Sequence, residues 1–248
     1  MSKKLVLLFV EGATDQRVFN NVAEEMSSEF LIFLVEPYNG DAFQINQPHS
    51  ALDKITSRIT EVLEKLYLTV NDLKSVYYLM DVDGTFIPDS DIIINPQVVA
   101  ENDFQYDPIN SRVNTASEKL QTSLKSRWSH KAQQIESALA NNEVVIDDVH
   151  IPLHLFYNSL TLEHVLNDNP IRGSQASTRK SRQGIRFQRH LKNRVDNNNT
   201  SYFTELKNWF GSLQHGETVA ESWEYVKLNP WERSSSVYLM LNMLKNEQ

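Results

Sequence analysis

Residues 5–15 read LVLLFVEGATD, and residues 76–83 read VYYLMDVD. Each stretch is a hydrophobic run of strand length that ends in acidic side chains, Glu11 in the first and Asp81 with Asp83 in the second. In an open parallel sheet, the residues just beyond the carboxyl ends of the strands meet in one crevice. We therefore expect an α/β fold that brings these carboxylates together, although they are far apart in the chain.

Apolar periodicity extends this interpretation along the chain. It predicts strands at 5–10, 30–35, 76–80 and 144–151, and helices at 14–26, 50–66 and 115–141. Residues 86–113 carry three prolines and read as an irregular insertion. This order predicts a Rossmann-like, mostly parallel sheet with helices on both faces, formed by residues 1–155. Beyond Pro152 the pattern turns helical, so we expect a helical C-terminal lobe over residues 156–248 that packs around several aromatic side chains.

Composition excludes several classes of protein. A chain of 248 residues that is 40% hydrophobic can bury a full core. The sequence has no cysteine, which excludes disulfides, thiolate zinc sites and a cysteine nucleophile. The apolar run near the N-terminus ends at Glu11, too early for a secretory signal, and no stretch approaches the roughly 20 apolar residues of a membrane span. We expect a cytoplasmic protein that does not enter the membrane.

The net charge of −8 conceals a basic segment at residues 169–195. This segment contains eight Lys or Arg residues and no acid, while the rest of the chain has 16 basic and 32 acidic side chains. Such a stripe is typical of a surface that binds a phosphate backbone, although a solvated helix face that balances an acidic body would have the same composition. The residues that we expect to bind nucleic acid are Arg179, Lys180, Arg182, Arg186, Arg189, Lys192 and Arg194.

The acidic residues suit a divalent cation. Asp81 and Asp83 are two positions apart, so they would point the same way in a regular strand and can reach one ion. Glu11 would complete the metal site or act as a general acid or base. Asp15 is a secondary ligand, but an acid in the first turn of a helix also suits the helix dipole. Glu163 would hold a second ion, or it is simply an exposed acid on a helix.

Residues 8–15, LFVEGATD, together with the later strand that ends in Asp81 and Asp83, resemble the Toprim domain. This domain is shared by topoisomerases, primases and OLD-family nucleases, and the OLD-like version is the most similar. The resemblance covers about residues 4–155 and implies that Glu11, Asp81 and Asp83 hold Mg²⁺ or Mn²⁺, with a further acid downstream. It implies a metal-dependent endonuclease acting on DNA or RNA, tRNA included. Stand-alone Toprim chains act as effectors in bacterial phage-defence systems, often beside an ABC-type ATPase. The resemblance therefore implies an ATPase partner, and a homodimer is a second assembly that the sequence allows.

Two alternatives use the same residues. Asp81-Val82-Asp83-Gly84-Thr85 after a hydrophobic strand also resembles motif one of haloacid dehalogenase-type phosphatases, in which Asp81 would be the nucleophile. Lys119, Lys125 or Lys131 would then serve as the lysine of that family, and Asp147-Asp148 as its acidic pair. The second alternative is a non-catalytic partner or sensor that docks through its aromatic C-terminal part.

Two further groups are weaker candidates for the site. Asp147-Asp148 is a reserve candidate that would face the same crevice as Asp81. His150 and His154 have the spacing of a helical zinc pair, but Pro152 between them argues against a helix.

Overall fold

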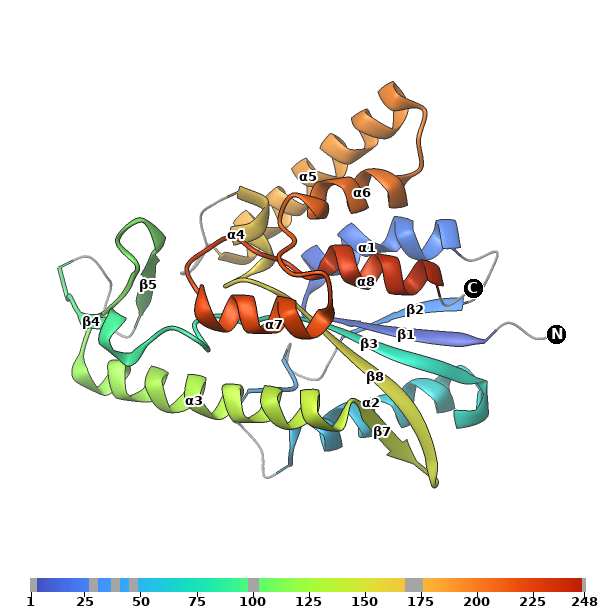
Figure 1. The fold of residues 1–248 in the computed structure, drawn as a ribbon, viewed down its shortest axis with the longest axis horizontal. Helices are drawn as coiled ribbons and strands as arrows, with labels where there is room; N and C mark the ends of the chain where they lie inside the picture. The colour runs from blue at the N-terminus through green and yellow to red at the C-terminus, as the bar shows by residue number, and fades with distance from the viewer. Residues whose placement is uncertain are drawn as a thin grey trace.

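The computed structural model describes residues 4–26, 31–36, 41–44, 49–97, 103–167 and 176–246, without the side chains of residues 13, 167 and 176–181. Its centre is a five-stranded sheet (Figure 1). The strand order is β2 (Leu31–Val35), β1 (Leu5–Val10), β3 (Leu73–Asp81), β8 (Val149–Asn158) and β7 (Glu143–Ile146). The first four strands are parallel and β7 is antiparallel to β8. The expected α/β class with a mostly parallel sheet is therefore confirmed.

Helices cover both faces of this sheet. One face packs on α2 (Ala51–Lys65), α3 (Glu118–Asn141) and α7 (Val219–Leu228). The other packs on α1 (Ala13–Met26), α4 (Leu162–Asn167), α5 (Ala176–Asn198), α6 (Tyr202–Gly211) and α8 (Val237–Asn246). In the part of the chain that the structure describes, no helix is both long and apolar enough to cross a membrane.

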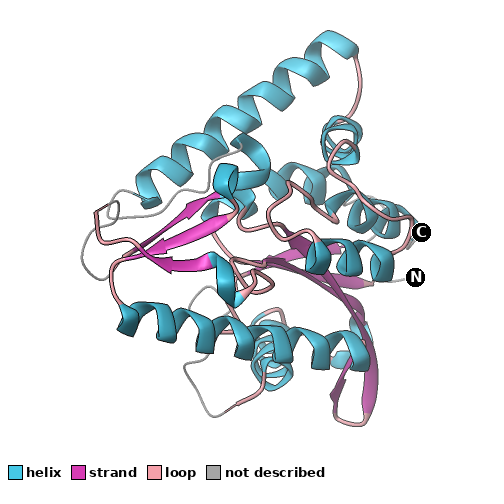
Figure 2. Cartoon of the chain, turned by 60° about the vertical axis from the view of Figure 1, so that its left-hand side comes forward, coloured by secondary structure: helices cyan, strands magenta, loops and turns pink. Residues whose placement is uncertain are grey.

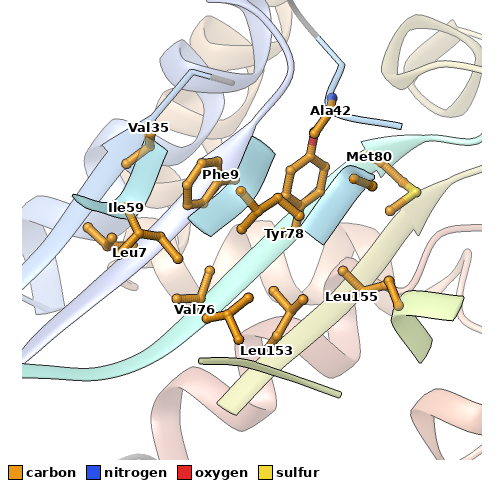
Figure 3. Close-up of a cluster of buried hydrophobic side chains, with 14 of the residues drawn as sticks. Leu7, Phe9, Val35, Ala42, Ile59, Val76, Tyr78, Met80, Leu153 and Leu155 are labelled. Atoms are coloured by element: carbon orange, nitrogen blue, oxygen red, sulfur yellow. Dashed lines mark hydrogen bonds between the residues drawn. The ribbon is translucent and has the colours of Figure 1, made fainter. Parts of the chain in front are cut away.

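The alternation of side chains along the strands explains this two-sided burial. Leu7 and Phe9 of β1 lie beside Val76 and Tyr78 of β3 in one buried cluster, in which Ile59 of α2 also takes part (Figure 3). The even-numbered residues of β1 face the opposite cluster with α1 and α8. Strands buried on both faces are hydrophobic at every position, which is why 5–10 and 76–80 read as continuous apolar runs.

The prediction of a single last strand at 144–151 was wrong, whereas the expected helices in the C-terminal part are present from Leu162 onward in the described residues. The chain forms a β7–β8 hairpin, and β8 continues to Asn158. Pro152 is tolerated in a strand because it pairs only with Glu143 of β7, while the β3 ladder begins one residue later. Residues 147 and 148 form the turn with φ values of 49° and 62°, which suits a tight hairpin.

This hairpin separates Asp147-Asp148 from the carboxyl ends of the strands. The turn lies at the amino end of β8, whereas Asp81 pairs with Asn158 at the other end. The 10 residues of β8 span about 30 Å, because a strand rises about 3.3 Å per residue. The expectation that these two acids face the same crevice as Asp81 was therefore wrong.

The insertion predicted as irregular is a small sheet. It contains β4 (Ile92–Ile94), β6 (Arg112–Thr115) and β5 (Phe104–Asp107) in that order, and it lies between α3 and α5 in Figure 2. Its buried side chains pack on Leu124 and Trp128 of α3. Strands of three or four residues are too short to show a period of two, so the sequence pattern did not reveal them.

Candidate functional site

The fold brings Glu11 and Asp81 to the same edge of the sheet. Glu11 follows the last residue of β1, and Asp81 is the last residue of the neighbouring strand β3. Asp83 follows two residues later, where its backbone N–H donates to the carbonyl of Leu160 at 2.8 Å. The three acids predicted from the sequence thus meet where the carboxyl ends of β1, β3 and β8 lie together (Figure 1).

Asp81 and Asp83 turn their carboxylates to different partners. Asp81 Oδ1 accepts a hydrogen bond of 2.8 Å from the backbone N–H of Leu162, at the start of α4. Asp83 Oδ2 lies 3.1 Å from Lys131 Nζ of α3. β3 ends at Asp81, and Asp83 has a left-handed φ of 52°, so the alternation of a regular strand no longer applies. The expectation that both side chains point the same way was wrong for this reason.

Lys131 and Asp41 belong to the same cluster. Lys131 Nζ lies 2.8 Å from Asp41 Oδ2, and it donates to the backbone carbonyl of Asp81 at 2.6 Å. Both side chains are 3% exposed. Asp41 Oδ1 accepts from the backbone N–H of Phe43 at 2.8 Å, which fixes the carboxylate. A buried ammonium with three oxygen partners is well compensated, whereas an unpaired one would be costly.

Asp41 was missed as a site residue because its stretch reads as a turn. The rule that identified Glu11 would have found it, since Asp41 lies beyond the carboxyl end of β2, the neighbour of β1. Tyr78 of β3 helps to hold this stretch, because its hydroxyl accepts a hydrogen bond of 3.0 Å from the backbone N–H of Ala42 (Figure 3). The Asp41 carboxylate therefore has a fixed place at the end of the sheet.

The Glu11 carboxylate lies in an unfavourable environment for a negative charge. Burial raises the pKa of Glu11 well above its ordinary value, and the neighbouring Asp41 raises it further. Lys131 lowers the pKa, while Asp81 and Asp83 raise it again. Among the residues that the structure describes, Glu11 Oε1 is buried without a hydrogen-bond partner. The cluster therefore holds four carboxyl groups against one ammonium, and an excess of negative charge persists even if Glu11 keeps its proton.

This donor set fits a hard divalent cation in its chemistry. Carboxylate oxygens are the preferred ligands of Mg²⁺ and Mn²⁺, and an orphaned carboxylate oxygen such as Glu11 Oε1 is a natural position for one. The described side chains nevertheless include no group of three His, Asp or Glu residues already arranged to hold one ion. The reason is local: Lys131 lies against Asp41 and Asp83, and Asp81 bonds to Leu162.

The secondary candidates Asp15 and Glu163 are both buried. Asp15 is 7% exposed in the first turn of α1, and Glu163 is 2% exposed in the first turn of α4. The alternative that Glu163 is an exposed helix acid was therefore wrong. Asp15 lies four residues after Glu11. Glu163 directly follows Leu162, whose N–H donates to Asp81. Helices α1 and α4 therefore both begin beside the acidic cluster.

The basic segment forms one face of α5. Arg182, Arg186 and Arg189 lie at helical spacing on its exposed side together with Lys192, while Phe187 and Leu191 on the opposite side are buried. Arg194 differs, because its Nε donates to the buried Glu205 at 2.6 Å. Arg194 thus has a partner within the protein, and its role in nucleic-acid binding stays a prediction. The side chains of Arg179 and Lys180, and residues 169–175, lie outside the described part of the chain.

The start of α5 lies close to the strand-end acids. A Cβ atom at Gly184 would come within 2.9 Å of Thr14 Cγ2, and the Gln188 side chain donates to the backbone carbonyl of Arg17. The first half of α5 thus packs on the first turns of α1, directly after Glu11. The basic face is turned outward from this contact, towards solvent.

The histidine pair is not a zinc site. His150 and His154 lie on β8, where His150 Nδ1 is 2.9 Å from Glu143 Oε1 and His154 packs on the ring of Tyr77.

Comparisons of the chain with protein-family models, curated proteins and solved structures find no match. Function must therefore be argued from the geometry.

Proposed function

We propose that this protein is a nuclease that depends on Mg²⁺ or Mn²⁺ and cleaves phosphodiester bonds in DNA or RNA. The observation that carries the proposal is the cluster of Glu11, Asp41, Asp81 and Asp83 around one lysine at the carboxyl ends of parallel strands. Such an excess of carboxylates destabilises the folded state unless a bound cation compensates the negative charge. The resemblance to the OLD-like Toprim domain implies that three of these acids, Glu11, Asp81 and Asp83, hold a metal.

Glu11, Asp81 and Asp83 are the residues that would hold the ion. When bound, a divalent cation neutralises charge on the scissile phosphate and lowers the pKa of a water molecule. Asp81 would be oriented by the Leu162 N–H, and Asp83 by Lys131. The alternative role for Glu11 is that of a general acid: if it does not bind the ion, its raised pKa suits it to hold a proton near the reacting phosphate and to donate it to the leaving oxygen.

The exposed face of α5 would hold the nucleic acid. Arg182, Arg186 and Arg189 supply the positive charge that attracts a phosphate backbone. The packing of Gly184 against Thr14 fixes this helix beside the first turn of α1, which follows Glu11. A strand bound along the helix can therefore continue across its amino end to the acidic cluster.

The test is cleavage of plasmid DNA and total tRNA by the purified full chain with Mg²⁺ or Mn²⁺. Asp81→Asn/Asp83→Asn keeps the shape and the hydrogen-bond acceptors of the site, so we expect loss of cleavage with a retained fold. Asp89→Asn is the matched control, because this acid is 74% exposed and only loosely paired with Lys125. An active double variant with a native circular dichroism spectrum would remove these two acids from the mechanism.

The phosphatase alternative has one observation in its favour. Lys131 contacts Asp83 and the carbonyl of Asp81, which is where a lysine would be needed beside an aspartate nucleophile. Its acidic pair, Asp147-Asp148, lies at the far end of β8. A small phosphate ester in the same assay separates the two activities, since a phosphatase would release phosphate from it and leave polynucleotides intact.

The biological setting follows from the same proposal. As an effector in bacterial phage defence, the chain would act in the cytoplasm and be controlled by an ABC-type ATPase. A non-catalytic sensor would show neither activity under any metal. Measuring cleavage by the chain with and without an added ABC-type ATPase and ATP tests this control.

A further inference from the structure

Among the described side chains of the acidic cluster, only that of Lys131 carries a positive charge. It projects from the middle of α3, and three protein oxygens lie near its Nζ: Asp41 Oδ2 at 2.8 Å, Asp83 Oδ2 at 3.1 Å and the carbonyl of Asp81 at 2.6 Å. It donates hydrogen bonds to Asp83 and to the Asp81 carbonyl, and it forms an ion pair with Asp41. The side chain is 3% exposed, so protein oxygens and not solvent surround the ammonium.

The contacts also hold the Lys131 ammonium in place. Two carboxylates, Asp41 and Asp83, lie within 3.1 Å of its Nζ. Asp41 is itself fixed by the Phe43 N–H. The result is an ammonium group at a defined position between two carboxylates.

We infer that Lys131 takes the place of a second metal ion, that Asp41 is the residue that positions it, and that the site therefore accepts a single divalent cation. This inference rests on the proposed function. In two-metal sites, two ions together hold the attacking and leaving oxygens of the phosphate. Here the Lys131 ammonium already contacts Asp41 and Asp83, so Glu11 and Asp81, with Asp83 shared, are the carboxylates left for an ion.

The charge balance supports one ion. Four carboxylates and one ammonium leave at most three negative charges, which one divalent cation nearly neutralises. Without Lys131, the buried Asp41 and the partly exposed Asp83 would lose the ammonium that both contact, a loss of positive charge that a bound cation would offset. Replacing Lys131 should therefore create a second metal site.

The experiment counts Mn²⁺ ions bound to the full chain by the electron paramagnetic resonance signal of free Mn²⁺ during a titration. We expect one ion for the wild type, two for Lys131→Met, and one for Asp41→Asn/Lys131→Met, in which the second carboxylate is gone. Lys125→Met, a partly exposed lysine on the same helix, is the control and should bind one. Thermal melts with and without Mn²⁺ accompany each titration, and Lys131→Met should regain with Mn²⁺ the stability that it loses without it.

The outcomes separate the inference from the proposed function. No bound Mn²⁺ in the wild type removes both. One ion in the wild type and one in a folded Lys131→Met overturns the inference alone, as do two ions in the wild type. If Lys131→Met stays unfolded with Mn²⁺ while the double variant folds, an ion does not replace the ammonium and the inference is wrong. If neither variant folds, the wild-type count decides: one ion supports the inference and two overturn it.

Discussion

Gly84→Ala should destabilise the protein at the point where the acidic motif meets α3. A Cβ atom at Gly84 would come within 2.3, 2.4 and 2.6 Å of three ring atoms of Trp128. The ring has little room to move, because it stacks on Tyr106 with centroids 6.3 Å apart and meets Phe104 edge to face at 5.9 Å. Overpacking a core costs about 1–3 kcal/mol, and a rigid buried ring places this case near the upper end.

Differential scanning calorimetry gives the assay for this change. A cost of about 2–3 kcal/mol corresponds to a melting temperature lower by about 4–12 °C in a chain of this size. Gly211→Ala is the matched control, since its Cβ would lie an ordinary 3.4 Å from Tyr238 at the end of α6, and it should be neutral or slightly stabilising. An unchanged melting temperature for Gly84→Ala would refute the argument.

A second-site variant tests the cause. Trp128→Leu removes the ring that the new methyl group would meet, so Gly84→Ala should cost much less in that background. The coupling free energy of the double-mutant cycle should be about 1–2 kcal/mol, well above the 0.3–0.5 kcal/mol scatter of independent sites. Because Asp83 precedes Gly84 and Lys131 follows Trp128 by one helical turn, the single variant should also lower cleavage in proportion to its disturbance of that pair.

Two further predictions concern the charges of the C-terminal helices. Arg186→Glu/Arg189→Glu should weaken nucleic-acid binding and flatten the slope of log K against log salt by about 2, measured by fluorescence anisotropy, whereas the exposed Lys245→Glu should leave the slope unchanged. The partners of Glu205, including Arg194, lower its pKa to about 2. A lowered carboxyl pKa adds stability above the unfolded value near 4.5, and this stability is lost as the pH falls towards 2. Melting curves should therefore show a steeper acid loss for the wild type than for Glu205→Gln, and parallel curves would contradict this assignment.

The sequence was sufficient for the strands that carry Glu11 and Asp81. Both strands are central in the sheet and buried on two faces, so they are hydrophobic along their length. The first acidic residue after each hydrophobic run therefore indicates where the strand ends. The β7–β8 hairpin was harder to predict, because its turn lies at residues that read as part of one strand. A hairpin turn of two aspartates with positive φ is a local conformation that periodicity does not detect.

The residues that complete the site depend on long-range packing. Lys131 lies in a polar helix whose charged residues look alike in sequence, and only the packing of α3 selects this lysine for burial. The orientation of Asp83 depends on its left-handed φ and on its backbone bond to Leu160, 77 residues later. Neither feature has a local pattern, so the sequence located three of the four acids and offered Lys131 only as one of three lysines in the phosphatase alternative.

The buried lysine also explains how such a cluster can exist in a folded chain before any metal binds. Carboxylates brought to one edge of a sheet repel one another; the pKa of Glu11 is raised first by its burial and then by Asp41, Asp81 and Asp83. Lys131 offsets this repulsion through contacts made entirely with the protein. Folding and metal binding are then separable, in contrast to small domains that fold only around their ion. In the function that we propose, the chain would therefore be folded before the divalent cation and the substrate bind, and cleavage would begin only when both are present.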